Sequence, residues 1–148
     1  MNLIKIFMCF VLVLICEKAM AVEPEVCFKE RCVKVELAIT EMERAKGLQG
    51  REELAEDRGM FFEFEQSGVY RFWMSKTLIP LDIIWLDENL KVVYFQENVL
   101  PCQKDPCPTY GSDDESLYVL EVQSGFVNKN KIVRGERFEF KSVEEALN

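Results

Sequence analysis

The feature that most constrains the fold of this chain is its series of short segments, each five to seven residues long, in which apolar residues run on or alternate with charged ones. Segments of this length are typical of β-strands. The predicted strands cover residues 33–39, 59–64, 69–74, 81–86, 90–96, 117–123 and 136–140. In a chain of 148 residues that is 49% apolar, these strands predict one mainly β (α+β) domain, a compact antiparallel β-barrel or sandwich.

Two small helices complete the predicted fold. Thr40 is followed three residues later by Glu43, a capping-box spacing that predicts a helix over residues 41–46. Ser124 is the predicted N-cap of a second helix over residues 125–130. Both helices are too short to form a layer of their own, so the sheet must supply most of the core.

The first residues are typical of an export signal. Residues 6–16 form an apolar run with the length of a signal-peptide core, and Ala19-Met20-Ala21 supplies the small-x-small pattern that a signal peptidase cleaves. We predict cleavage after Ala21. This assigns residues 1–21 to a signal peptide and residues 22–148 to a single exported domain.

The predicted location is therefore the periplasm or the outside of the cell. The run over residues 6–16 is short for a membrane span, and no stable span is expected after cleavage. The alternative is a lipid anchor at Cys16. Ile15 disfavours that alternative, because lipoprotein processing prefers a small residue before the cysteine.

Four cysteines remain in the predicted mature chain, as two pairs with four residues between the members: Cys27, Cys32, Cys102 and Cys107. An even number of cysteines in an exported protein favours disulfides, and four cysteines allow three pairings. Local geometry favours Cys27–Cys32 across a hairpin and Cys102–Cys107 across a short loop. The Lys29-Glu30 pair is a poor hairpin turn, and a zinc site built from all four thiolates stays an alternative.

The chain contains no histidine, which excludes a Ser-His-Asp triad, a Cys-His dyad and an HExxH zinc site within it. Its formal net charge of −8 opposes nonspecific nucleic-acid binding. The sequence has no phosphate-binding loop, dinucleotide fingerprint or other cofactor motif. We predict no cofactor, no metal and no nucleic-acid partner, and we expect a small ligand or an envelope protein as the partner.

Acidic residues stand at two positions within predicted strands that we expect to be buried. Asp82 lies within the apolar strand 81–86, and Glu121 lies between Leu120 and Val122 in the strand 117–123. A buried carboxyl needs a partner or a raised pKa. The structural interpretation pairs each acid with an arginine or with backbone N–H groups. The functional interpretation has the two acids converge in a cleft, as the general acid and base of a hydrolase acting on sugars do.

A cluster of aromatic and methionine residues suggests a second kind of site. Phe72, Trp73 and Met74 are three large residues in a row, so at least one of them is expected to point away from the main core. With Thr77 they are candidates for a ligand-binding groove. The structural alternative is that a helix or the long loop over residues 98–116 covers them.

Several stretches of the chain carry a resemblance to a known family. They are Glu36-Leu37-Ala38 with Thr40, Glu43-Arg44, Gly47-Leu48, Gly50-Arg51, Gly59-Met60-Phe61-Phe62, Phe72-Trp73-Met74, Thr77-Leu78-Ile79-Pro80-Leu81-Asp82-Ile83, Tyr118-Val119-Leu120-Glu121-Val122, Gly125-Phe126, Ile132 and Gly135-Glu136. Over about residues 33–140 this pattern resembles domain of unknown function 192, DUF192, a family of bacterial and archaeal proteins. Gln49 and Glu136 depart from it, where the family often has Met and Asp. The resemblance implies a compact, mainly β fold, commonly in exported proteins, and no established activity.

Three functions are compatible with these observations. The first is a binding or accessory module with a groove near Trp73 and Met74. The second is a hydrolase-like enzyme that uses Asp82 and Glu121 with Arg51 or Lys76. The third is a purely structural envelope protein.

Overall fold

The computed structural model describes residues 22–143, so the predicted signal peptide and Cys16 lie outside the described residues. The elements in chain order are β1 (Glu25–Phe28), β2 (Arg31–Ala38), α1 (Glu41–Lys46), β3 (Arg58–Gly68), β4 (Phe72–Trp73), β5 (Leu81–Leu86), β6 (Val92–Val99), β7 (Thr109–Tyr110), β8 (Ser116–Gln123), α2 (Phe126–Asn130) and β9 (Glu139–Lys141). Neither helix in this range has the length and apolar character needed to cross a membrane.

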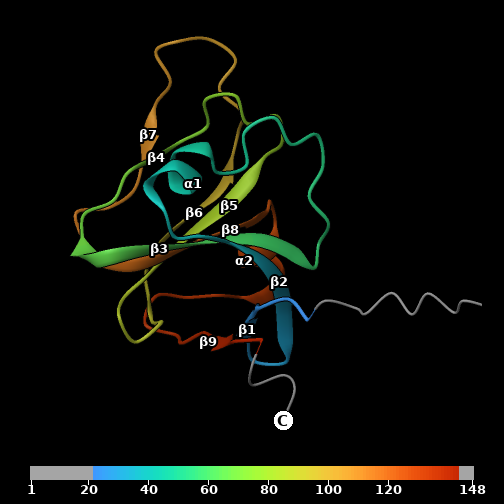
Figure 1. The fold of residues 1–148 in the computed structure, drawn as a ribbon, viewed down its shortest axis with the longest axis vertical. Helices are drawn as coiled ribbons and strands as arrows, with labels where there is room; N and C mark the ends of the chain where they lie inside the picture. The colour runs from blue at the N-terminus through green and yellow to red at the C-terminus, as the bar shows by residue number, and fades with distance from the viewer. Residues whose placement is uncertain (1–21, 144–148) are drawn as a thin grey trace, which may run out of the picture.

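A curled sheet of seven strands forms the body of the molecule and has the shape of half a barrel (Figure 1). Its strand order is β6-β5-β8-β3-β2-β1-β9, and β4 and β7 form a separate two-stranded sheet. The neighbours are antiparallel except β2 and β3, which run parallel. The predicted mainly β, barrel-like fold with two small helices is confirmed, with one parallel pair in place of a wholly antiparallel sheet.

The parallel pair is possible because α1 and the loop after it connect β2 to β3. Parallel neighbours need a crossover connection of this kind, because a tight turn can join only antiparallel strands. The Oγ1 atom of Thr40 accepts a hydrogen bond from the backbone N–H of Glu43 at 3.2 Å, and the Glu43 carboxylate accepts one from the backbone N–H of Thr40 at 2.9 Å. The predicted capping box and the predicted bounds of this helix are both confirmed.

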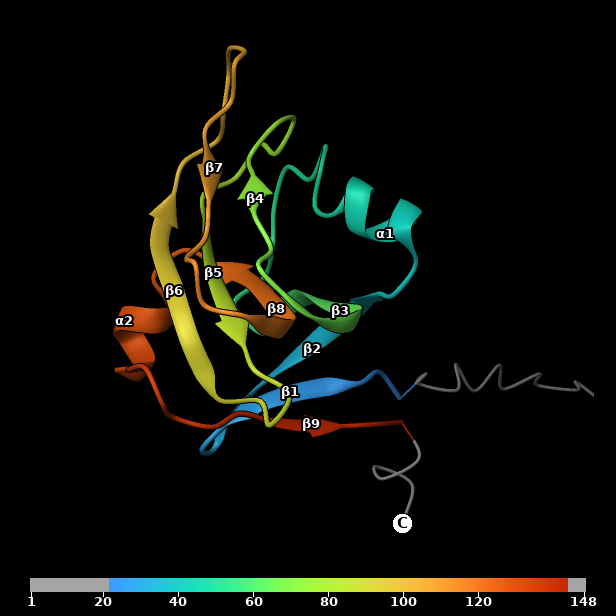
Figure 2. The same ribbon diagram turned by 90° about the vertical axis from the view of Figure 1, so that its left-hand side faces the viewer.

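The sheet has an apolar core on each of its two faces. Ile84 and Leu120 belong to the core that packs against Phe126 of α2. Ile83 and Val119 belong to the other core, on the side of α1 and β4. Figure 2 shows α1 and α2 on opposite sides of the sheet. Because side chains alternate along a strand, consecutive positions of β5 or β8 enter different cores.

β5 is the most enclosed strand, and all six of its residues are buried. It lies between β6 and β8 in the sheet, and each of its faces is covered. Its bounds agree with the predicted strand 81–86. β6 and β9 begin later than the sequence predicts, at Val92 and Glu139.

The predicted strand over residues 69–74 is the largest departure, because only Phe72 and Trp73 of it form β4. The chain before β4 is held by tertiary contacts instead of a strand ladder. The backbone carbonyl of Tyr70 accepts a hydrogen bond from Nε1 of Trp85 at 2.9 Å, and the Tyr70 ring stacks on Phe64. These contacts turn the segment away from β3, and β4 pairs with β7 instead.

The predicted cap of the second helix is wrong. The hydroxyl of Ser124 donates to Oδ1 of Asn98 at 2.9 Å, and the N-cap of α2 is Gly125, which has no side chain to bond. A residue from another strand takes over this role. The Oδ2 atom of Asp82 accepts a hydrogen bond from the backbone N–H of Val127 in the first turn of α2 at 2.8 Å.

Both predicted disulfides are present. Cys27 and Cys32 lie directly opposite each other on β1 and β2, with their Cα atoms 3.9 Å apart, and Cys102 is bonded to Cys107. The Lys29-Glu30 turn between Cys27 and Cys32 requires a positive φ, which is +55° at Lys29. A lysine rarely adopts this conformation, which is why the sequence makes a poor hairpin turn. Two disulfides indicate an oxidising environment, which agrees with an exported protein.

Candidate functional site

Asp82 is fully buried, and each of its carboxylate oxygens accepts a backbone hydrogen bond. Oδ1 accepts from the N–H of Asn98 and Oδ2 accepts from the N–H of Val127, both at 2.8 Å. These bonds tie the start of β5 to the end of β6 and to the start of α2. Of the partners expected from the sequence, the backbone groups are the ones present. The arrangement stabilises the fold and leaves neither oxygen directed at a cavity.

Glu121 lies on the opposite face of the sheet. In the pairing of β5 with β8, Asp82 is opposite Val122 and Ile83 is opposite Glu121. Asp82 and Glu121 are therefore one position out of register with each other. Because side chains alternate between the two faces of a sheet, these two side chains enter different cores. The structure does not bring the two predicted acids together.

The carboxyl of Glu121 has no compensating partner. Its side chain is 5% exposed, and within residues 22–143 no hydrogen bond or ion pair reaches its carboxyl oxygens. Burial raises the pKa of Glu121 to about 8. At neutral pH this glutamate is therefore mainly a neutral acid, which can both donate and accept a hydrogen bond.

Glu121 lines a small pocket that we call the Glu121 pocket. Its other lining residues come from the end of α1 with the following loop, from β3 and from the segment around β4: Arg44, Ala45, Lys46, Gly47, Leu48, Gln49, Phe62, Phe72, Trp73 and Thr77. Its volume is about 30 Å³. A cavity of that size holds one or two water molecules, and the residual exposure of Glu121 opens into it.

The end of α1 is brought close to the pocket floor by Gly47. This residue has φ +47°, a conformation that favours glycine, and a Cβ placed on it would lie 3.5 Å from the ring of Phe62. Arg44, one turn earlier, donates to the carbonyls of Ile39 and Glu63, and its guanidinium lies over the ring of Phe64. The helix is thereby fastened to the edge of β3, and its last turn forms one wall of the pocket.

The predicted groove residues differ in their exposure to solvent and in whether they line the Glu121 pocket. Trp73 is 54% exposed and lines the Glu121 pocket, whereas Met74 is fully buried in the adjacent core. Phe72 packs edge-to-face against Phe62 and Trp85, and Thr77 is buried at the pocket wall. Three of the four predicted groove residues, Phe72, Trp73 and Thr77, therefore line one pocket. Met74 lies in the core on the same side of the sheet.

Arg51 and Lys76 do not join either acid. Arg51 forms an ion pair with Glu36 and lines a wide surface depression of about 1090 Å³. Lys76 is exposed, has φ +58°, and lines a separate hollow of about 460 Å³ beside the Cys102–Cys107 loop. The candidate hydrolase residues are therefore spread over four places in the molecule.

Sequence reasoning did not find Arg44, Lys46 and Gln49 as pocket residues. The capping box predicts where α1 begins, but nothing local to that helix tells which strand it will cover. The position of the end of α1 at the Glu121 pocket depends on the parallel crossover from β2 to β3, which a sequence pattern of short strands does not specify. No local pattern in the sequence identifies these three residues as pocket residues.

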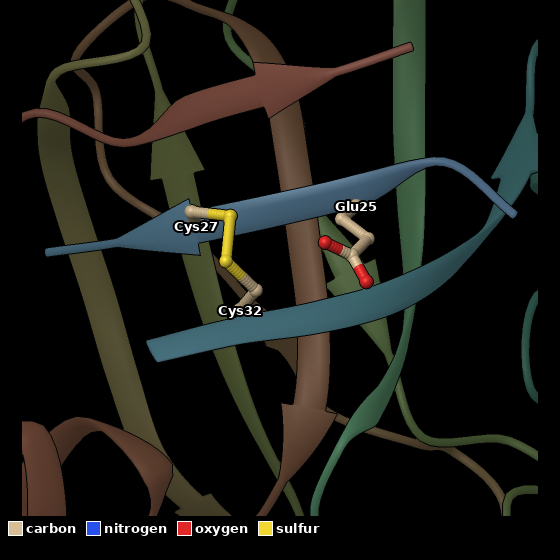
Figure 3. A group of neighbouring side chains, drawn as sticks. All are labelled: Glu25, Cys27 and Cys32. Atoms are coloured by element: carbon tan, nitrogen blue, oxygen red, sulfur yellow. A yellow bond between two sulfur atoms is a disulfide. The ribbon is translucent and has the colours of Figure 1, made fainter. Parts of the chain in front are cut away.

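A group of possible metal ligands lies on the first hairpin, where Glu25 is close to Cys27 and Cys32 (Figure 3). One ligand atom from each residue lies within 4.8 Å of the others. The two sulfur atoms are joined in a disulfide, so neither is a thiolate. The alternative of a four-cysteine zinc site requires thiolates that this structure places in two disulfides.

Comparison with known proteins adds a family and a fold. The sequence model of DUF192, uncharacterized ACR, matches residues 25–140. A structure from Sinorhizobium meliloti 1021, described as a "putative transcription regulator", is 28% identical with a TM-score of 0.71, covering 79% of this chain and 91% of that one. A protein of unknown function from Novosphingobium aromaticivorans DSM 12444 is 31% identical with a TM-score of 0.70, covering 78% of this chain and 82% of that one. No curated protein matches the chain significantly.

Proposed function

This chain belongs to the DUF192 family, and from that premise we propose that it is a small exported binding module whose ligand enters the Glu121 pocket. The observation that carries the proposal is the carboxyl of Glu121, which is buried without a partner at a pocket wall. Burying such a group lowers the stability of the free protein. A ligand that hydrogen-bonds to the carboxyl would compensate for that loss.

Trp73 supports the same location. A tryptophan that keeps half of its surface exposed at the rim of a pocket offers a rigid apolar platform at little cost in conformational entropy. Thr77 adds a hydroxyl on the pocket wall. The pocket thus combines an apolar rim with a few convergent polar groups, which is the usual composition of a ligand site.

Binding is favoured over hydrolysis by the number of acids present. A glycosidase-like mechanism uses two carboxyl groups that flank one bond, and the Glu121 pocket contains one. Asp82, the other candidate, has both oxygens engaged by backbone N–H groups on the far side of the sheet. A purely structural role leaves the unpartnered carboxyl without an explanation.

Export is the second part of the proposal. The signal-like residues 6–21 and the two disulfides support it. The net charge of −8 argues against extending to this chain the description of its structural neighbour from Sinorhizobium meliloti, since DNA repels an acidic protein.

The proposal can be tested by recording backbone amide spectra while adding mixtures of small hydroxylated, amino and carboxylic compounds. We expect binding compounds to shift the amides of Gly47 and Thr77 and the indole N–H of Trp73. Glu121→Met should abolish these shifts, and Glu97→Met, at an exposed residue of β6, should keep them. If the shifts instead gather around Arg51, or if no class of compound moves the three reporters, the pocket is not the binding site.

A further inference from the structure

The occupant of the Glu121 pocket can be narrowed further, and this step rests on the proposed function. We propose that the pocket receives a hydroxyl group of a carbohydrate whose ring lies against Trp73. The size of the pocket, its polar groups, its charges and its aromatic rim each bear on this choice.

Size is the first constraint. A pocket of about 30 Å³ accepts a group of about the size of one or two water molecules. A hydroxyl or a primary ammonium group meets this limit. A phosphate or a sulfate carries five heavy atoms and is the poorer match to a space of this size.

The polar groups of the pocket match a hydroxyl. A protonated carboxyl at Glu121 and the hydroxyl of Thr77 can each donate one hydrogen bond and accept others. A sugar hydroxyl is likewise both a donor and an acceptor, so it can satisfy both partners at once. The raised pKa of Glu121 agrees with this neutral arrangement, because it keeps the carboxyl protonated near neutral pH.

Charge separates the two groups that fit by size. The last turn of α1 places Arg44 and Lys46 among the residues that line the pocket, in which Glu121 is the single acid. An ammonium group would lie near two cationic residues, and it would gain the full attraction of Glu121 only after that acid has ionised. A neutral hydroxyl avoids both costs, so the wall favours a hydroxyl over an amine.

The aromatic rim suggests what carries the hydroxyl. Phe62, Phe72 and Trp73 all line the pocket, and Trp73 is the exposed member of the three. A carbohydrate ring has an apolar C–H face that packs on an exposed aromatic ring, with hydroxyl groups around its edge. One ring can therefore lie on Trp73 while one of its hydroxyl groups points to Glu121.

The test uses maltotriose, cellotriose and triacetylchitotriose, with butylammonium chloride and sodium acetate as the competing classes. Binding is followed by the amide shifts of Gly47 and Thr77, which remain measurable in every variant. We expect at least one oligosaccharide to bind at millimolar concentration. Glu121→Gln, which keeps a neutral hydrogen-bonding group, should retain the affinity within about threefold, whereas Glu121→Met and Trp73→Ala should each lower it about tenfold or more. Glu97→Met is the matched control.

The outcomes separate this inference from the proposed function. If butylammonium binds instead, and Glu121→Gln abolishes its binding, the pocket is a ligand site but its ligand is an amine. If acetate binds, the ligand is an acid and the carbohydrate inference is wrong. If none of the five compounds moves the two reporters, both the carbohydrate inference and the assignment of the pocket fail.

Discussion

Asp82 and Glu121 show two ways in which one sheet buries a carboxyl group. They lie on neighbouring strands, within one position of each other in register, and enter opposite cores. The Asp82 carboxylate receives two backbone hydrogen bonds, whereas in the described part of the chain no hydrogen bond reaches the carboxyl of Glu121. The first acid belongs to the scaffold, and the second is the residue on which the proposed binding site rests. Burial of an acid does not by itself indicate function; the state of its hydrogen bonds does.

The largest expected effect is that of Asp82→Asn. The amide cannot accept from both backbone N–H groups, so one buried donor is left unsatisfied and the start of α2 loses its anchor. We expect the free energy of unfolding to fall by about 3 kcal/mol. Chemical denaturation at pH 7 measures this, with Asp57→Asn at an exposed position as the control. A wild-type midpoint would show that Asp82 is not a scaffold residue.

Glu121→Gln should act in the opposite direction. The amide has nearly the same shape and cannot ionise, so the folded protein no longer has to hold a proton that the unfolded chain releases at neutral pH. We expect the variant to gain about 2 kcal/mol at pH 7. Denaturation under the same conditions is the measurement. A loss as large as that of Asp82→Asn would mean that both acids are structural and would remove the basis for the pocket.

The pH dependence of stability sharpens the same contrast. The pKa of Glu121 is raised from 4.5 to about 8, so its protonated form stabilises the folded state fully below pH 4.5, and this contribution is lost as the pH rises to about 8. Above about pH 6 the other carboxyl groups are ionised in both states, and the chain has no histidine, so no other side chain ordinarily titrates between pH 6 and 7.5. The wild-type unfolding free energy should fall by roughly 1 kcal/mol per pH unit between pH 6 and 7.5. The Glu121→Gln variant should lack this slope, and equal slopes in the two proteins would contradict the assignment.

Trp73→Ala should have the smallest effect on stability. Half of the side chain is exposed, and its removal leaves the buried Met74 and Phe72 in place. We expect a change of about 0.5 kcal/mol or less, measured by thermal unfolding. Trp85→Phe provides the contrast, because Trp85 is buried and donates to Tyr70, so its loss should lower the midpoint clearly. A large loss for Trp73→Ala would assign Trp73 to the core and not to a ligand surface.

Much of the fold could be predicted because local chemistry determines it. α1 follows from the Thr40–Glu43 capping box, β5 from its continuous apolar run, and the first hairpin from the spacing of Cys27 and Cys32. In each case the residues that determine the structure lie within a few positions of one another. The second helix shows the limit, because its first turn is bound by Asp82, 45 residues away.

The candidate site could be predicted only in part, for a related reason. Glu121, Trp73 and Thr77 stood out as residues, since an acid in an apolar strand and an exposed aromatic run are visible in one sequence. Their convergence on one pocket depends on the crossover of β2 and β3, which brings the end of α1 to the pocket that Glu121 lines. Pairing Glu121 with Asp82 failed because the register between β5 and β8 puts them on different faces, and a strand pattern alone does not set that register.

β1 and β9 pair with each other, although they lie at opposite ends of the described chain. Glu25 lies opposite Lys141, so the first and last strands of the domain are neighbours at one edge of the sheet. A short linker could join them directly, and new termini could then open at the exposed turn of Glu88 and Asn89 without removing a strand. Such a circular permutant would begin with β6 and end with β5, yet it would keep every strand neighbour. The spatial arrangement of this domain is therefore separable from the order in which its strands are synthesised.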